Sequence, residues 1–141
     1  MRASEMTPEP VARAVSIRSV EAVEAGDREA WLALFGDDAV VEDPIGPSPF
    51  DPTGEGHRGI GAIRRFYDTV IAPNSVRFDI HSSHAGGDEV ANVCTITTTM
   101  ADGSKAIVDA VSTYRVDAAG RLVALRAYWE MGAMRFEPSD G

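Results

Sequence analysis

The feature that most constrains the fold is a change of hydrophobic period near Asn74. Before this residue, apolar side chains recur at intervals of three and four, as on a helix face; after it, they alternate with polar residues, as in half-buried strands. Helices followed by a series of strands are typical of an α+β domain with the helices on one face of the sheet. The 141 residues, 44% hydrophobic, suit one domain with one core. We expect a single domain over 1–141, with flexible ends at 1–7 and 136–141.

Three helices are predicted in the first half of the chain, over residues 7–25, 27–35 and 59–71. Thr7 is the expected N-cap of the first helix, and Gly26 is the expected terminating glycine. Ser19 shares a face with Val15 and Val23, at spacings of four, so it is predicted to point inward. Its hydroxyl is then either bonded to the Val15 carbonyl or free to act on a ligand.

The second half predicts four strands, over residues 76–82, 89–100, 106–116 and 122–131, after a shorter extended run that ends at Asp43. Alternation assigns the inward faces of the last two strands. These faces are expected to carry Val108, Ala110, Ser112, Tyr114 and Val116 on one strand, and Val123, Leu125, Ala127, Trp129 and Met131 on the other.

Asp43 is the strongest candidate for a catalytic residue in the sequence. It follows a short extended run and opens a loop rich in proline and glycine. It shares its side of the strand with Val41 rather than with the acidic Glu42. Apolar surroundings disfavour a charged carboxylate, raise its pKa and make it a stronger proton acceptor. Asp43 is therefore a candidate general base, although Asp-Pro also commonly opens a turn.

Composition excludes several other functions. A net charge of −9 argues against nucleic acid and anionic membranes as partners. The chain has no stretch apolar enough for a membrane span and no signal core, and its single cysteine, Cys94, forms no internal disulfide; we therefore expect a cytoplasmic protein. His81 and His84 are predicted on opposite faces of a strand, and no cluster of ligands accompanies them. We expect neither a metal nor a cofactor.

Several segments together resemble the bacterial ketosteroid isomerases, in order and with few gaps between residues 11 and 131. They are residues 37–46, 59–67, 114–121 and 127–129. The resemblance implies the cone-shaped nuclear transport factor 2-like fold, with three amino-terminal helices packed on a curved, mostly antiparallel sheet around an apolar pocket. SnoaL-like polyketide cyclases and limonene epoxide hydrolases share this cone, so fold alone does not fix function.

The resemblance places the family's general base on Asp43 and its supporting tyrosine on Tyr67. The family's two oxyanion donors, a tyrosine and a protonated aspartic acid, fall on Ser19 and Ser112, which do not match them. In ketosteroid isomerase these two donors form the oxyanion hole beside an aspartate base. Either Tyr67 reaches the substrate oxygen, or Ser19 and Ser112 hold a water that donates to it. The expected catalytic set is Asp43, Tyr67, Ser19 and Ser112, and the expected substrate-binding set is Trp129, Val41, Phe66, Val108, Ala110 and Leu125.

The function expected from these residues is proton transfer next to a carbonyl, in a steroid delta-isomerase-like reaction on an apolar, steroid-like substrate. The alternatives are a SnoaL-like polyketide cyclase and a protein that binds a lipophilic molecule without catalysis. We expect His57, at the end of the long loop 44–58, to be solvated. We also expect a homodimer, because Ile107, Thr113 and Tyr128 occupy outward strand positions.

Overall fold

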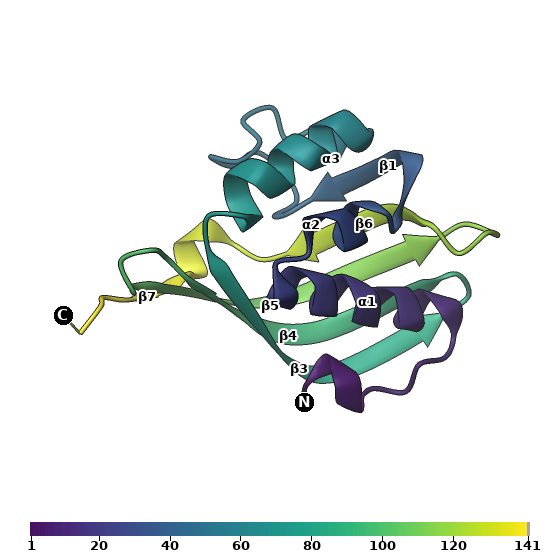
Figure 1. Cartoon of the computed structure of the whole chain (residues 1–141), viewed down its shortest axis with the longest axis horizontal. Helices are drawn as coiled ribbons and strands as arrows, with labels where there is room; N and C mark the ends of the chain where they lie inside the picture. The colour runs from purple at the N-terminus through teal and green to yellow at the C-terminus, as the bar shows by residue number, and fades with distance from the viewer. Residues whose placement is uncertain (141) are drawn as a thin grey trace.

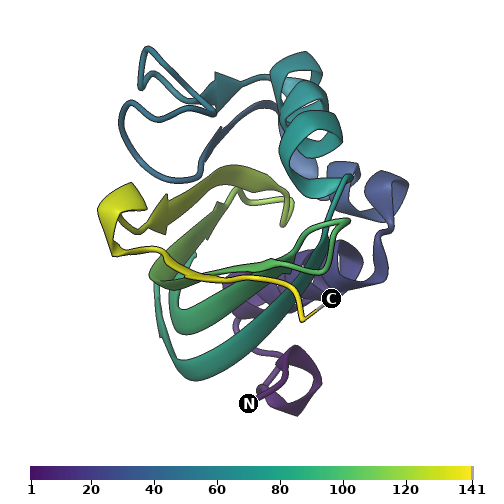
Figure 2. The same cartoon turned by 90° about the vertical axis from the view of Figure 1, so that its left-hand side faces the viewer.

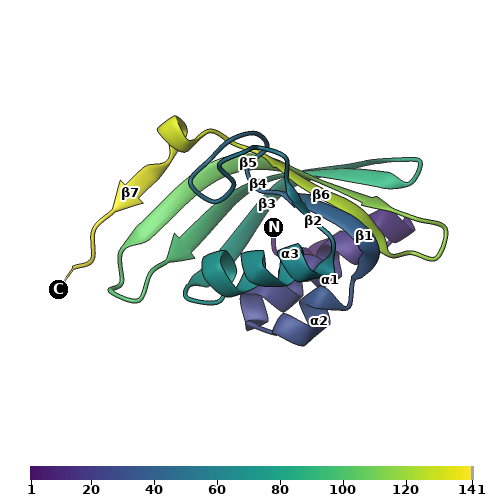
Figure 3. The ribbon, with the colours of Figure 1, turned by 90° about the horizontal axis from the view of Figure 1, so that it is seen from above.

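The computed structural model describes residues 1–140 and has the predicted α+β architecture, with the helices gathered on one side of a curved mixed sheet (Figures 1 and 3). The helices are α1 (Val11–Ala25), α2 (Arg28–Leu32) and α3 (Ile60–Phe66), which continues as a π-helical turn (Tyr67–Ile71); short 3-10 helices span Ala3–Glu5 and Met131–Ala133.

The sheet has seven strands in the order β2-β1-β6-β5-β4-β3, with β7 paired to β5. Their bounds are β1 (Phe35–Glu42), β2 (His57–Arg58), β3 (Ser75–Gly86), β4 (Glu89–Thr99), β5 (Lys105–Val116), β6 (Leu122–Tyr128) and β7 (Arg135–Glu137). β1 runs parallel to β6, and every other pair is antiparallel. Figure 2 shows the long strands curling so that their concave side faces the helices.

The first helix begins later than predicted. Its N-cap is Pro10 rather than Thr7, and the first helical hydrogen bond joins the Ala14 amide to the Pro10 carbonyl. A proline disfavours helical conformation in the residue before it, so Glu9 cannot continue a helix that starts at Thr7. The carboxyl-terminal end is as predicted, because Gly26 adopts a left-handed conformation with φ of 67°.

The amino-terminal residues, which we expected to be flexible, pack against the rest of the domain. Ala3 and Met6 are buried, and the Arg2 guanidinium donates to the Phe78 carbonyl and to Glu24. These contacts tie the amino-terminal end to β3 and to the last turn of α1.

Further element boundaries differ from the predictions. The second helix stops at Leu32, and Phe35 instead begins β1, where it pairs with Leu122. β6 ends at Tyr128, so Trp129 leaves the strand. At the carboxyl-terminal end, where we expected flexibility from residue 136, residues 135–137 form β7 along β5. Sheet pairing, a contact between distant parts of the chain, decides each of these ends.

The inward face of β5 is as predicted: Val108, Ala110, Ser112, Tyr114 and Val116 are all buried. On β6, Leu125 and Ala127 are buried as predicted, but Leu122 is buried in place of Val123, because a register shift between Arg115 and Val116 changes the face. No helix within residues 1–140 is both long and apolar enough to cross a membrane.

Candidate active site

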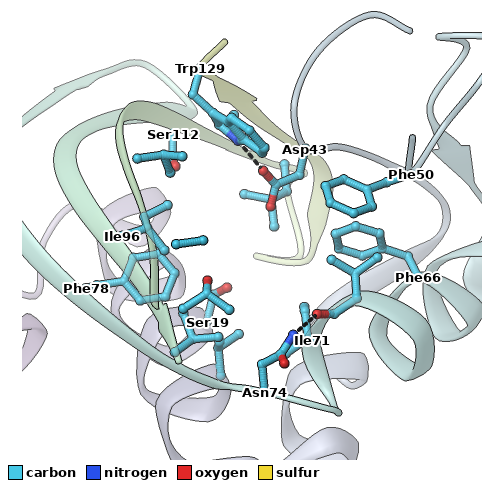
Figure 4. Close-up of a pocket in the computed structure, with 18 of the residues that line it drawn as sticks. Ser19, Asp43, Phe50, Phe66, Ile71, Asn74, Phe78, Ile96, Ser112 and Trp129 are labelled. Carbon is cyan, nitrogen blue, oxygen red and sulfur yellow. Dashed lines mark hydrogen bonds between the residues drawn. The ribbon is translucent and has the colours of Figure 1, made fainter. Parts of the chain in front are cut away.

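A cavity of about 360 Å³ lies between the concave side of the sheet and the helices. Apolar side chains such as Phe66, Phe78 and Ile96 form most of its wall (Figure 4). Asp43 is the single carboxylate among the lining residues. An apolar cavity with a few convergent polar groups is the usual form of a small-molecule site.

Asp43 lies just beyond the end of β1, where the chain turns into the loop, and its carboxylate points into the cavity (Figure 4). The Trp129 indole nitrogen donates to the Asp43 Oδ1 at 2.6 Å. Enclosure by protein raises the pKa of Asp43, and the hydrogen bond from Trp129 and the nearby His57 offset only part of that rise. The carboxylate is thus a stronger proton acceptor than an exposed aspartate, and it is held in one orientation.

Trp129 reaches Asp43 because β6 ends at Tyr128, the residue before it. The Ile45 amide donates to the Ala127 carbonyl at 3.0 Å, which joins the start of the loop to the end of β6. This contact brings the residues after β1 and after β6 to the same corner of the cavity. Trp129 therefore lines the cavity, as predicted, and also positions the carboxylate.

Ser19 lies across the cavity from Asp43 (Figure 4). The Trp31 indole nitrogen donates to Ser19 Oγ at 3.1 Å, in place of the expected bond between Ser19 and the Val15 carbonyl. Trp31 is buried and comes from α2, whose N-cap Asp27 accepts from the Ala30 amide. Ser19 Oγ therefore accepts from Trp31 and retains its own proton.

Ser112 also lines the cavity, beside Trp129 and away from Ser19 (Figure 4). Burial raises the pKa of the Cys94 thiol to about 11, and the Ser112 hydroxyl offsets part of that rise. Cys94 is thus a neutral thiol at physiological pH and not a nucleophile. Ser19 and Ser112 lie apart on the cavity wall, so they present hydroxyls to different parts of a ligand (Figure 4).

Tyr67 does not line the cavity, contrary to our expectation for this residue. It is buried against Trp31, with ring centroids 5.4 Å apart, and the pKa of its hydroxyl is raised by burial and by the neighbouring Asp27. The reason is helical geometry: adjacent helix residues point about 100° apart. Phe66 faces the cavity, as predicted, so Tyr67 faces α2 instead.

Two residues of the expected substrate-binding set also lie outside the cavity, while Phe66, Val108, Leu125 and Trp129 line it. Val41 is fully buried in the core beneath β1. Ala110 packs with Val20, Ile80 and Cys94 in a second apolar cluster behind the cavity wall. Both face inward as alternation predicted, but facing the core is not the same as reaching a ligand.

Two site residues were missed from the sequence. Tyr114 was placed on the inward face but given no role, and it lines the cavity next to Ser19. His57, expected to be solvated, lies in β2, where it pairs with Val41 of β1. Its ring stacks on that of Phe66, with ring centroids 4.8 Å apart. Its Nε2 is buried without a hydrogen-bond partner. A signal for Tyr114 was present, since an inward-facing hydroxyl must find a partner.

The family described as SnoaL-like domain matches residues 17–137 of the chain. The steroid delta-isomerase of Nocardioides simplex is 29% identical over 127 residues, which cover 90% of this chain and 96% of that protein.

Solved structures agree. The Δ5-3-ketosteroid isomerase of a Mycobacterium species superposes with a TM-score of 0.87 and 45% identity, over 91% of this chain and 99% of that one. RV0760c of Mycobacterium tuberculosis, in complex with estradiol-17beta-hemisuccinate, superposes with a TM-score of 0.86 and 38% identity, over 91% of this chain and 100% of that one.

Proposed function

The chain belongs to the SnoaL-like family, of nuclear transport factor 2-like fold, and from this premise we propose that it is a steroid delta-isomerase-like enzyme with Asp43 as its general base. The observation that carries the proposal is one carboxylate with a raised pKa, fixed by Trp129, in a mostly apolar cavity with the Ser19 hydroxyl on its far side. The names of the similar proteins make isomerisation of a steroid plausible for this chain.

The proposed reaction needs no cofactor. Asp43 takes a proton from the carbon between a ketone and an isolated double bond, and the electrons of that C–H bond move into an enolate. The same carboxyl group then returns the proton to the far carbon of the former double bond. The ketone is regenerated in conjugation with the shifted double bond, and Asp43 is again ionised. An apolar wall suits this chemistry because a desolvated carboxylate is a stronger base.

The test is to incubate the protein with a Δ5-3-ketosteroid and follow the absorbance of the conjugated enone. We expect turnover by the wild type and loss of at least about 10²-fold in Asp43→Asn, the lower end of the range for a positioned base. Asp38→Asn makes the same chemical change at an exposed position of β1 and is the matched control. Wild-type turnover that survives in Asp43→Asn would show that Asp43 is not the base.

Asp43→Asn should not lose activity by unfolding. The pKa of Asp43 is raised in the folded state, so its ionised form costs stability above that pKa. The amide can still accept from Trp129, so the free energy of unfolding at pH 7 should stay within about 1 kcal/mol of the wild type or rise. Any gain should vanish as the pH falls below the ordinary value of 3.8, where the carboxyl group is neutral in both states.

Two other functions remain as outcomes of the same test. A SnoaL-like polyketide cyclase would use the same base but close a ring, so it would leave the steroid unchanged. A non-catalytic binder would hold a steroid without turnover, and the complex of RV0760c with an estradiol derivative shows that a similar protein binds a steroid-like ligand. The ionisable base at the cavity wall favours an enzyme over a binder. A cytoplasmic location is part of the same proposal, since the one cysteine is a buried free thiol.

A further inference from the structure

Tyr114 is the one tyrosine of the chain's three that lines the cavity. It lies on β5, two residues beyond Ser112, so both side chains project from the same face of the strand. Its side chain is 3% exposed. Within residues 1–140, the only enclosed side-chain polar atom that lacks a hydrogen-bond partner is His57 Nε2, so Tyr114 has no such atom. Its ring is therefore fixed by packing.

Three hydrogen-bond donors follow one another, from Trp31 of α2 through Ser19 of α1 to the Tyr114 hydroxyl of β5. Trp31 donates to Ser19 Oγ at 3.1 Å, which leaves the Ser19 proton free. The Ser19 hydroxyl lies next to Tyr114 and lowers the pKa of the phenol, because it favours the ionised form. Hydrogen bonds in such a row polarise one another, so each strengthens the next donor.

We propose that Tyr114 donates the hydrogen bond that stabilises the enolate oxygen of the substrate, so that the phenol missing from position 19 on α1 is supplied from β5. This inference rests on the proposed isomerase function. The geometry supports it: the phenol lines the cavity beside the small Ser19, and Ser19 lies across the cavity from Asp43 (Figure 4). A substrate between the two would present its carbonyl oxygen to Tyr114 and its acidic carbon to Asp43.

The protonation states are consistent with this division of labour. Burial, the Cys94 thiol and the Asp43 charge all raise the pKa of Tyr114, so the phenol keeps its proton at neutral pH. The proton stays on Tyr114 throughout, in a hydrogen bond that strengthens as negative charge develops on the substrate oxygen. The proton that moves is carried by Asp43 alone. Removing one preorganised donor of this kind lowers kcat by about 10²–10³-fold.

The kinetic test compares Tyr114→Phe with the wild type in the Δ5-3-ketosteroid assay. The ring is kept and only the hydroxyl is lost, so kcat should fall by at least about 10²-fold. KM should change little, since the lost interaction acts mainly in the transition state. Tyr128→Phe makes the same change at a tyrosine on the outer surface, 48% exposed, and should leave kcat unaltered. If Tyr114→Phe keeps wild-type kcat while Asp43→Asn loses it, the isomerase proposal stands and the role of Tyr114 is overturned.

A binding test separates the two proposals further, because it needs no turnover. The probe is 2-naphthol, whose fluorescence distinguishes its neutral and ionised forms, with naphthalene as the matched ligand that lacks the oxygen. If Tyr114 donates to a ligand oxygen, Tyr114→Phe should weaken 2-naphthol binding about tenfold, the loss of one hydrogen bond of about 1.4 kcal/mol, without weakening naphthalene binding.

The outcomes are distinct. A wild type with no steroid turnover, but with the selective loss of naphthol affinity, would overturn the isomerase proposal and support Tyr114 as a donor to ligand oxygen. Equal losses for both probes would show that Tyr114 only shapes the cavity, and would overturn its role as a donor.

Discussion

At the scale of single residues, the contact between Trp129 and Asp43 has two opposing effects: it lowers the base strength of the carboxylate, and it fixes the orientation of the carboxylate. The indole donates to Oδ1 at 2.6 Å and so stabilises the carboxylate, which opposes the rise in pKa caused by burial. A hydrogen bond to a charged group is worth about 1.5–3 kcal/mol. The same bond fixes the direction in which the carboxylate points. Removing it should therefore change both the pH dependence and the maximal rate.

We predict that Trp129→Phe moves the acid limb of the kcat/KM profile to higher pH. The carboxylate loses a partner that favours its ionised form, so the pKa of Asp43 rises further and a larger share of the enzyme is protonated near neutrality. The maximal rate at high pH should also fall, because the freed carboxylate samples other orientations. An acid limb at the wild-type position, measured by the enone assay across pH, would show that Trp129 does not tune Asp43.

The candidate site was predicted from the sequence where strand geometry alone decides it. Asp43 ends a strand, and its side follows from alternation with Val41. Tyr67 was assigned wrongly because it adjoins Phe66 on a helix, and only packing shows which of the two faces the cavity. Tyr114 was placed on the correct face but given no role, because its proximity to Ser19 joins β5 to α1 and no local pattern encodes that contact.

At the scale of elements, α1 is fastened to the sheet by a buried polar cluster around Asn92 of β4. The Asn92 amide nitrogen donates to Ser16 Oγ at 3.1 Å, and Ser83 Oγ donates to Asn92 Oδ1 at 2.7 Å. Arg13 of α1 donates to the same Ser83 at 2.9 Å. Asn92 is 2% exposed, so no solvent would replace these partners. The cluster fixes how α1, and with it Ser19, sits on the sheet.

We predict that Asn92→Ala lowers the free energy of unfolding by about 1–3 kcal/mol, because Ser16 loses its buried donor and Ser83 its acceptor. The measurement is chemical denaturation. Asn74→Ala, the same change at the chain's other asparagine, should cost less, since Asn74 bonds only the Val70 carbonyl four residues earlier, at 3.3 Å. Equal losses in the two variants would mean that the cluster contributes no more than a local bond.

The hydrophobic period predicted which segments are helices and which are strands, but it did not predict several of their ends. Gly26 and Asp27 act as the predicted helix end and helix start because their roles are local. The end of α2 depends on the pairing of Phe35 with Leu122, and the end of β6 on the contact of Ala127 with Ile45. The whole of β7 depends on pairing with Lys105–Ile107, and all these partners are distant in sequence. The parallel pairing of β1 with β6 likewise carries no local signal.

At the scale of the whole molecule, the helices cover only one side of the sheet (Figure 3). The other side carries an apolar row. Val93, Val111 and Tyr128 lie side by side across β4, β5 and β6, with Val111 in register with both others. Val111 is half-buried and Tyr128 is 48% exposed. Thr113 and Ile107 continue this face along β5, as predicted. We propose that this outer face forms the interface of a homodimer, because the apolar row of Val93, Val111 and Tyr128 marks an interaction site.

The last prediction tests that interface. Light scattering at micromolar concentration should give twice the chain mass of 15.1 kDa for the wild type and the mass of one chain for Val111→Lys. A two-fold interface brings the same patch of both chains together, so one substitution places two unpaired charges in it. Arg18→Glu, which changes a charge on the exposed face of α1, should leave the mass unchanged. Circular dichroism would confirm that Val111→Lys still folds. A wild type with the mass of one chain, or a Val111→Lys variant that keeps the doubled mass, would place any self-association elsewhere on the molecule.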